Sequence, residues 1–109
     1  MDRRLEDGVE EILTNRTTTG AGAAFPTANV NMVSFHVSGK TTAGAGAATV
    51  KIQVSNDGLV WLDLATVTLT LSTTATSDGF ATQAPWVFTR ANVTALSGTG
   101  ASVSVVMGV

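Results

Sequence analysis

Residues 50–64 read VKIQVSNDGLVWLDL, and this stretch decides the fold class. Its first half alternates apolar and polar side chains, and successive side chains of a strand face opposite sides of a sheet. The Asn-Asp-Gly run that follows supplies a turn, because Gly58 takes a positive φ at little cost and Asn and Asp bond their own backbone. The stretch therefore predicts two antiparallel strands joined by a turn. We assign structural roles in this turn to Asn56, Asp57, Gly58 and Trp61.

The same alternation recurs along the chain. It predicts further strands over residues 30–38, 67–71, 86–95 and 103–107. The Gly- and Ala-rich run at 40–48 and the polar run at 72–79 are typical of loops. Strands at this spacing without helical patterns between them predict an all-β fold, an antiparallel β-sandwich wired as a jelly roll or Greek key. The apolar faces of the strands carry Val33, Phe35, Val37, Val50, Ile52, Val54, Val67, Leu69, Leu71, Val103, Val105 and Met107.

The first residues follow a different pattern. Over residues 2–13, apolar side chains at helical spacing predict a short amphipathic helix, with Asp2 placed to cap it. Two interpretations remain open, a helix packed on its own domain and an arm that docks on a partner. The expected organisation is an arm at 1–16, a linker or edge segment at 17–29 and a sandwich domain at 30–109. The side chains expected to bind a partner are Leu5, Val9, Ile12 and Leu13.

Charge is scarce outside this segment. Eight of the 14 charged residues lie in the first 16 positions, and the six in the remaining chain sum to zero. Without a basic patch, the body is not expected to bind nucleic acid or a membrane. The absence of Cys excludes disulfides and thiolate chemistry. The charged start does not resemble a signal peptide, so the protein is expected to be made in the cytosol.

No residue pattern favours catalysis, a metal or a cofactor. His36 is the single histidine, without a nucleophile or second ligand in sequence reach. Asp57 and Asp78 are expected in turns and Asp63 exposed on a strand, at spacings that match no calcium loop. Arg90 shares a strand face with Trp86 and Phe88 and is expected to pack its stem across aromatic rings, with ligand binding as the alternative. Trp61 and Trp86 fit either packing or stacking on a sugar, and both interpretations stay open.

Three segments together resemble the core of discoidin-type jelly rolls. They are VKIQVSNDGLVW at 50–61, WVFTRANV at 86–93 and ASVSVV at 101–106. In those modules a strand, an S-x-D-G-x-x-W turn and a later aromatic-x-Arg strand follow in that order. The chain lacks the aromatic and basic loop residues with which such modules bind sugars or lipids.

The whole pattern resembles small bacteriophage virion proteins, which are Thr-, Ala- and Gly-rich jelly rolls without Cys and with a short N-terminal arm. This resemblance implies a non-enzymatic virion protein made in the host cytoplasm, most often a trimeric capsid decoration (cement) protein bound to the major capsid protein. The alternatives are a tail, neck or baseplate component and, from another class, a carbohydrate-binding module.

Overall fold

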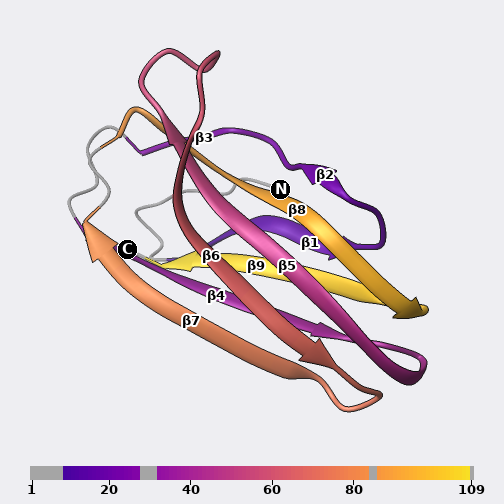
Figure 1. The fold of residues 1–109 in the computed structure, drawn as a ribbon. Helices are drawn as coiled ribbons and strands as arrows, with labels where there is room; N and C mark the ends of the chain where they lie inside the picture. Colours follow the sequence, from indigo (N-terminus) through magenta and orange to yellow (C-terminus); the bar gives the residue numbers. More distant parts are fainter. Residues whose placement is uncertain (1–8, 28–31, 84–85, 109) are drawn as a thin grey trace.

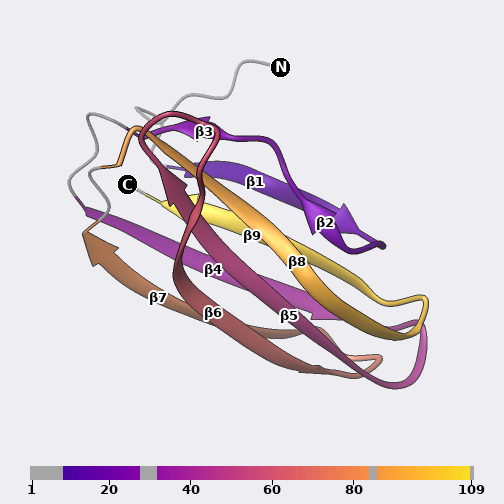
Figure 2. The ribbon, with the colours of Figure 1, turned by 45° about the horizontal axis from the view of Figure 1, so that its top comes forward.

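A computed structural model describes residues 9–27, 32–83 and 86–108, which form two stacked antiparallel sheets (Figures 1 and 2). One sheet has the strand order β1-β9-β4-β7. The other has the order β2-β8-β5-β6, and β3 also pairs with β8. The strands are β1 Val9–Arg16, β2 Gly20–Ala21, β3 Phe25–Pro26, β4 Met32–Lys40, β5 Ala43–Ser55, β6 Leu62–Leu71, β7 Thr76–Gln83, β8 Phe88–Thr99 and β9 Ser102–Gly108.

The strand order is that of a jelly roll. The chain stays in one sheet from β2 to β3 and from β5 to β6, and it crosses to the other sheet at each of the remaining connections. Each sheet therefore alternates strands from the two halves of the chain, which is the double Greek-key arrangement. The expected antiparallel sandwich is confirmed.

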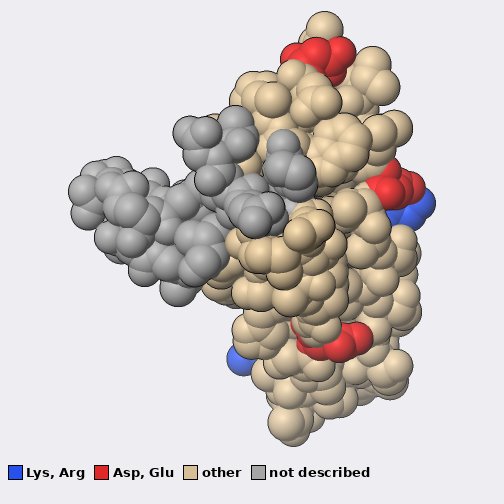
Figure 3. All heavy atoms as spheres, turned by 90° about the vertical axis from the view of Figure 1, so that its left-hand side faces the viewer, with Lys and Arg blue, Asp and Glu red and all other residues tan. Residues whose placement is uncertain are grey.

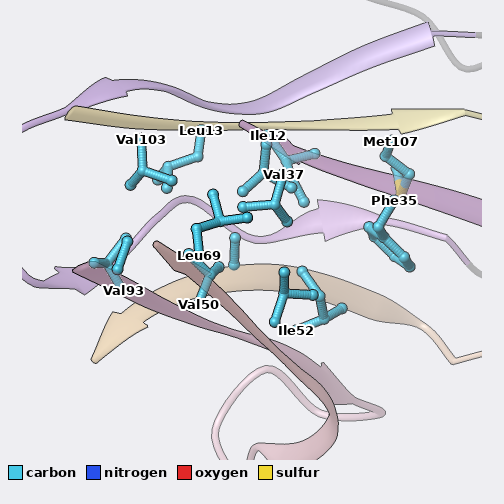
Figure 4. Packing of buried hydrophobic residues seen from close by; sticks show 14 of the residues in the cluster. Ile12, Leu13, Phe35, Val37, Val50, Ile52, Leu69, Val93, Val103 and Met107 are labelled. Atoms are coloured by element: carbon cyan, nitrogen blue, oxygen red, sulfur yellow. The ribbon is translucent and has the colours of Figure 1, made fainter. Parts of the chain in front are cut away.

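The core lies between the sheets (Figure 4). Phe35, Val37 and Met107 point from one sheet toward Val50 and Ile52 of the other. All the apolar-face residues expected from the alternation are buried, at 5% exposure or less. Burial of these faces is the main stabilising contribution to the fold, because it removes apolar surface from water.

The expected N-terminal helix is wrong for residues 9–16. These residues form β1, which pairs with β9 at the edge of the four-stranded sheet. Ile12 and Leu13 are both buried in the core, although consecutive strand residues normally face opposite sides. A register shift beside them, between Glu11 and Leu13, allows both side chains to turn inward. Leu5 lies outside the described residues, as do the side-chain surroundings of Val9.

Two expected loops are also corrected. Within 40–48 the structure places the start of β5 at Ala43, and within 72–79 it places the start of β7 at Thr76. In β5, Gly46 lies against Ser97 and Gly98 of β8 so closely that a Cβ atom would collide with the backbone. The small residues that suggested a loop thus permit two strands to approach.

Candidate interaction surface

The loop between β5 and β6 is held by one buried hydroxyl and one carboxylate. Ser55 Oγ accepts hydrogen bonds from the backbone N–H groups of Asp57 and Gly58, at 3.2 and 2.9 Å. Asp57 Oδ1 accepts from the N–H groups of Leu59 and Val60, at 2.8 and 2.9 Å, and from Ser55 Oγ at 3.0 Å. Five hydrogen bonds of these two side chains therefore hold the loop in one conformation.

The loop is also tied to the start of β8. Asn56 Oδ1 accepts a hydrogen bond from the N–H of Val87 at 3.3 Å. Gly58 has the expected positive φ, 75°, and lies beside the ring of Phe88. The turn residues predicted from the sequence are thus brought together, although the connection spans the six residues 56–61 and is not a tight hairpin turn.

This fixed loop presents apolar side chains to solvent. Leu59 is 84% exposed, Val60 65% and Leu62 51%. Val60 and Leu62 line a pocket of about 250 Å³ whose wall includes Trp86, a side chain that also packs on the core. We call Leu59, Val60, Leu62 and Trp86 the loop-end surface. Met32, the remaining large apolar residue that is exposed among the described residues, begins β4 at the same end of the sandwich.

The outer face of the five-stranded sheet carries a row of interacting polar side chains. Arg90, Gln53 and Asp63 are register neighbours on β8, β5 and β6. Arg90 Nε donates to Gln53 Oε1 at 2.8 Å, and Gln53 Nε2 donates to Asp63 Oδ1 at 2.9 Å. Lys51 Nζ forms an ion pair with Asp63 Oδ2 at 3.0 Å. These bonds hold the pKa of Asp63 below its ordinary value, Gln53 contributing most and Lys51 next.

Arg90 ends this row on an aromatic ring, as expected, but the ring is that of Trp61 and not one from its own strand face. Its guanidinium carbon lies 4.2 Å from the centroid of the Trp61 ring, within cation–π range. One face of Trp61 is thereby covered by a side chain of the same domain. This arrangement favours packing over sugar stacking for Trp61, and Trp86 combines core packing with a place in the pocket wall.

The remaining titratable residues do not lie together in one site. His36 is exposed on the outer face of β4, and Asp63 is exposed on β6, both as expected. Asp78 was expected in a turn, but it lies inside strand β7. No three His, Asp or Glu side chains of residues 9–27, 32–83 and 86–108 gather as metal ligands would.

Figure 3 shows charged side chains as isolated spots on a mainly uncharged face. No helix among the described residues is long and apolar enough to cross a membrane.

Sequence reasoning did not single out the exposed apolar residues Leu59, Val60 and Leu62, nor two polar residues of this region, Gln53 and Ser55. The two polar residues share the outward face of β5 with Lys51, so alternation alone was enough to place them. Their roles depend on neighbours that alternation does not give. Opposite Gln53, β6 has an extra residue, Leu64, and this bulge brings Asp63 into register with the amide.

Acid is expected to loosen the loop through Asp57. The hydrogen bonds from Val60, then Leu59, then Ser55 hold the pKa of this carboxyl below its ordinary value of 3.8. Since the folded-state pKa is the lower one, the carboxylate stabilises the loop above pH 3.8 and loses this effect as the pH falls through the folded value. The protection of the Leu59 and Val60 amides against exchange, measured by NMR relative to the unprotected rate at each pH, should decrease in this acidic range. The Asp57→Asn variant should lack the acid-dependent step, and the same step in that variant would exclude Asp57 as its cause.

Comparison with known proteins finds the fold but no family. No family profile matches the chain, and no curated protein matches it. Among solved structures, the chain is similar to PBSX exported protein XepA, with a TM-score of 0.59 and 13% identity. The match covers 99% of this chain and 38% of the other, so the chain spans well under half the length of that protein. This likeness is one of fold, the jelly-roll sandwich described above.

Proposed function

We propose that this chain is a non-enzymatic structural protein of a phage particle and that its loop-end surface binds another virion protein. The observation that carries the proposal is the exposure of Leu59 and Val60 on a loop fixed by Asp57, and of Leu62 beside them at the start of β6. Exposed large apolar side chains that gather at one site mark protein interfaces more often than they mark unused surface. The fold likeness to XepA, a phage-related protein, agrees with the resemblance of the sequence to virion proteins.

The loop is suited to binding because its backbone is ordered before a partner arrives. Binding costs free energy for each loop that must be ordered, and the five hydrogen bonds of Ser55 and Asp57 reduce this cost. The pocket beside Val60 and Trp86 offers an anchoring site for one apolar side chain of a partner. The carboxylate of Asp57 already accepts hydrogen bonds from the backbone of its own loop, so a partner would contact mainly the apolar side chains of this surface.

The position that we propose in the particle is the outside of the capsid shell, as a decoration protein that contacts the major capsid protein, with a homotrimer as the assembled form. A tail, neck or baseplate position is the alternative within the same class. The carbohydrate-binding module is less favoured, because Arg90 covers one face of Trp61 and holds the amide of Gln53.

A binding experiment separates these possibilities. Co-sedimentation of the purified chain with purified shells and, separately, with purified tails should show binding to one of them at micromolar concentrations. Leu59→Asp and Val60→Asp should each weaken that binding by about tenfold or more, since loss of an apolar anchor costs about 1–2 kcal/mol or more. Thr68→Asp is the matched control, because Thr68 is exposed on β6 outside the loop-end surface.

The outcomes are distinct. Because the contact is apolar, binding should change little between low and moderate salt. Binding that Leu59→Asp and Val60→Asp leave intact would contradict the role of this surface. Absence of binding to shells and tails, together with glycan binding that Trp61→Ala abolishes, would favour the carbohydrate-binding module instead.

A further inference from the structure

Strand β7 forms an edge of the four-stranded sheet, with β4 as its ladder partner among the described strands. Its ladder runs through eight consecutive residue pairs without a register shift. Free edges of this kind are templates for pairing with another chain, and proteins protect them with bulges, prolines or charges. The other edges carry such features. β1 has two register shifts, β6 has the bulge at Leu64, and β2 and β3 are two residues long.

The middle of β7 consists of two residues that disfavour strands, Asp78 and Gly79. This is why the sequence predicts a loop there. Gly79 lies so close to β4 that a Cβ atom would collide with the carbonyl oxygen of Phe35. The glycine therefore permits the close pairing of β7 with β4, whereas the side chain of Asp78 makes no hydrogen bond to β4.

Asp78 acts on the free side of the strand. Its Oδ1 accepts a hydrogen bond from the backbone N–H of Gly79 at 2.8 Å, so this N–H points away from β4. By the alternation of an antiparallel ladder, Ser77, Ala81 and Gln83 also present their backbone groups to the free edge. The carboxylate thus occupies the central donor that an added strand would need.

The carboxylate is also on the face that an added strand would bury. Asp78 lies opposite Val37, on the same face as the tilted Phe35–Phe80 pair, whose ring centroids are 5.3 Å apart. That face looks toward the core, yet Asp78 is exposed because β7 is at the edge. A strand laid beside β7 would enclose the carboxylate between Val37 and the added strand without a cationic partner, which is unfavourable.

We propose that Asp78 blocks the β7 edge against pairing with a second copy of this chain. The same edge is present on every copy, and a two-fold antiparallel pairing centred on Phe80 is geometrically complete. It places Gly79 opposite Ala81 and Asp78 opposite Thr82, with the two Phe80 rings adjacent at the axis. The two Asp78 carboxylates do not face each other in this register. Pairing is therefore opposed by two effects: the N–H of Gly79 already donates to Asp78, and burial of the carboxylate costs free energy.

Sedimentation equilibrium over a concentration series tests this block. Asp78→Thr removes the carboxylate and adds a side chain that favours strands. It should strengthen association by tenfold or more relative to the native chain, beyond any assembly that the native chain itself shows. Adding Ala81→Pro to Asp78→Thr should return the self-association to the level of the native chain. Proline removes a backbone N–H at the free edge that the pairing uses, and it leaves the ladder to β4 intact.

Asp78→Asn provides a second measurement that does not depend on the folding of the threonine variant. It keeps an oxygen acceptor for Gly79 and removes the charge, so it should strengthen association by a smaller factor. The proposal is overturned if the folded variants associate no more strongly than the native chain. It is equally overturned if Ala81→Pro leaves the added association unchanged, since the new contact would then lie elsewhere.

Discussion

Deletion of residues 1–16 is expected to abolish cooperative unfolding, because it removes strand β1 from the four-stranded sheet. Ile12 and Leu13 point into the core between the sheets (Figure 4). Losing a large buried aliphatic side chain costs about 2–5 kcal/mol, and a domain of this size has a total stability of about 5–15 kcal/mol. Loss of two such side chains together with the backbone ladder to β9 is of the same order as the whole stability.

Thermal unfolding followed by circular dichroism measures this effect. The native chain should show one cooperative transition and the truncated chain none. Thr18→Ala is the control, since Thr18 is exposed in the segment after β1 and its replacement should leave the transition in place. A truncated chain with a native-like transition would mean that β1 is a dispensable arm, and the account of the core given above would fail.

Phe35→Ala is expected to lower the free energy of unfolding by about 3–5 kcal/mol. The Phe35 side chain is 2% exposed and lies between the sheets, where it packs on the ring of Phe80. Its removal leaves a cavity that the neighbouring strands fill incompletely, because their backbones are fixed by ladders on both sides of β4.

Urea titration gives this value, and the adjacent residue supplies a matched control. His36 is on the same strand but faces solvent, so His36→Ala should change the stability by less than about 0.5 kcal/mol. Similar losses in the two variants would contradict the assignment of opposite faces to these neighbours. A loss below about 1 kcal/mol for Phe35→Ala would contradict its place in the core.

Much of the fold was predictable from local pattern. Alternation placed the inward side chains of β4, β5, β6 and β9 correctly, since strands buried on one face require apolar residues at every second position. The turn chemistry at 56–58 was also predictable, because Asp57 and Gly58 act through bonds to residues a few positions away. The packing of Arg90 on an aromatic ring was predicted, but the ring is that of Trp61 in the β5–β6 loop, which its place on the strand did not indicate.

The errors occur where a distant strand overrides the local pattern. Residues 9–13 have helical spacing, but the backbone of β9 offers them a ladder, and a register shift turns two consecutive apolar side chains inward. Gly46 suggests a loop, yet the backbone of β8 lies where a side chain would be. Asp78 and Gly79 suggest a turn, yet they lie in a strand paired with β4.

The candidate interaction surface divides in the same way. The sequence by itself determined that an apolar Leu59-Val60 pair follows a turn rich in hydrogen-bonding groups, because that turn depends on adjacent residues. Only the tertiary structure decided that Trp86, far along the chain, forms the wall of the pocket beside this loop, and that the bulge at Leu64 aligns Asp63 with Gln53 and Arg90. The physical reason is that turns are short-range structures, whereas strand register depends on the combined packing of the two sheets.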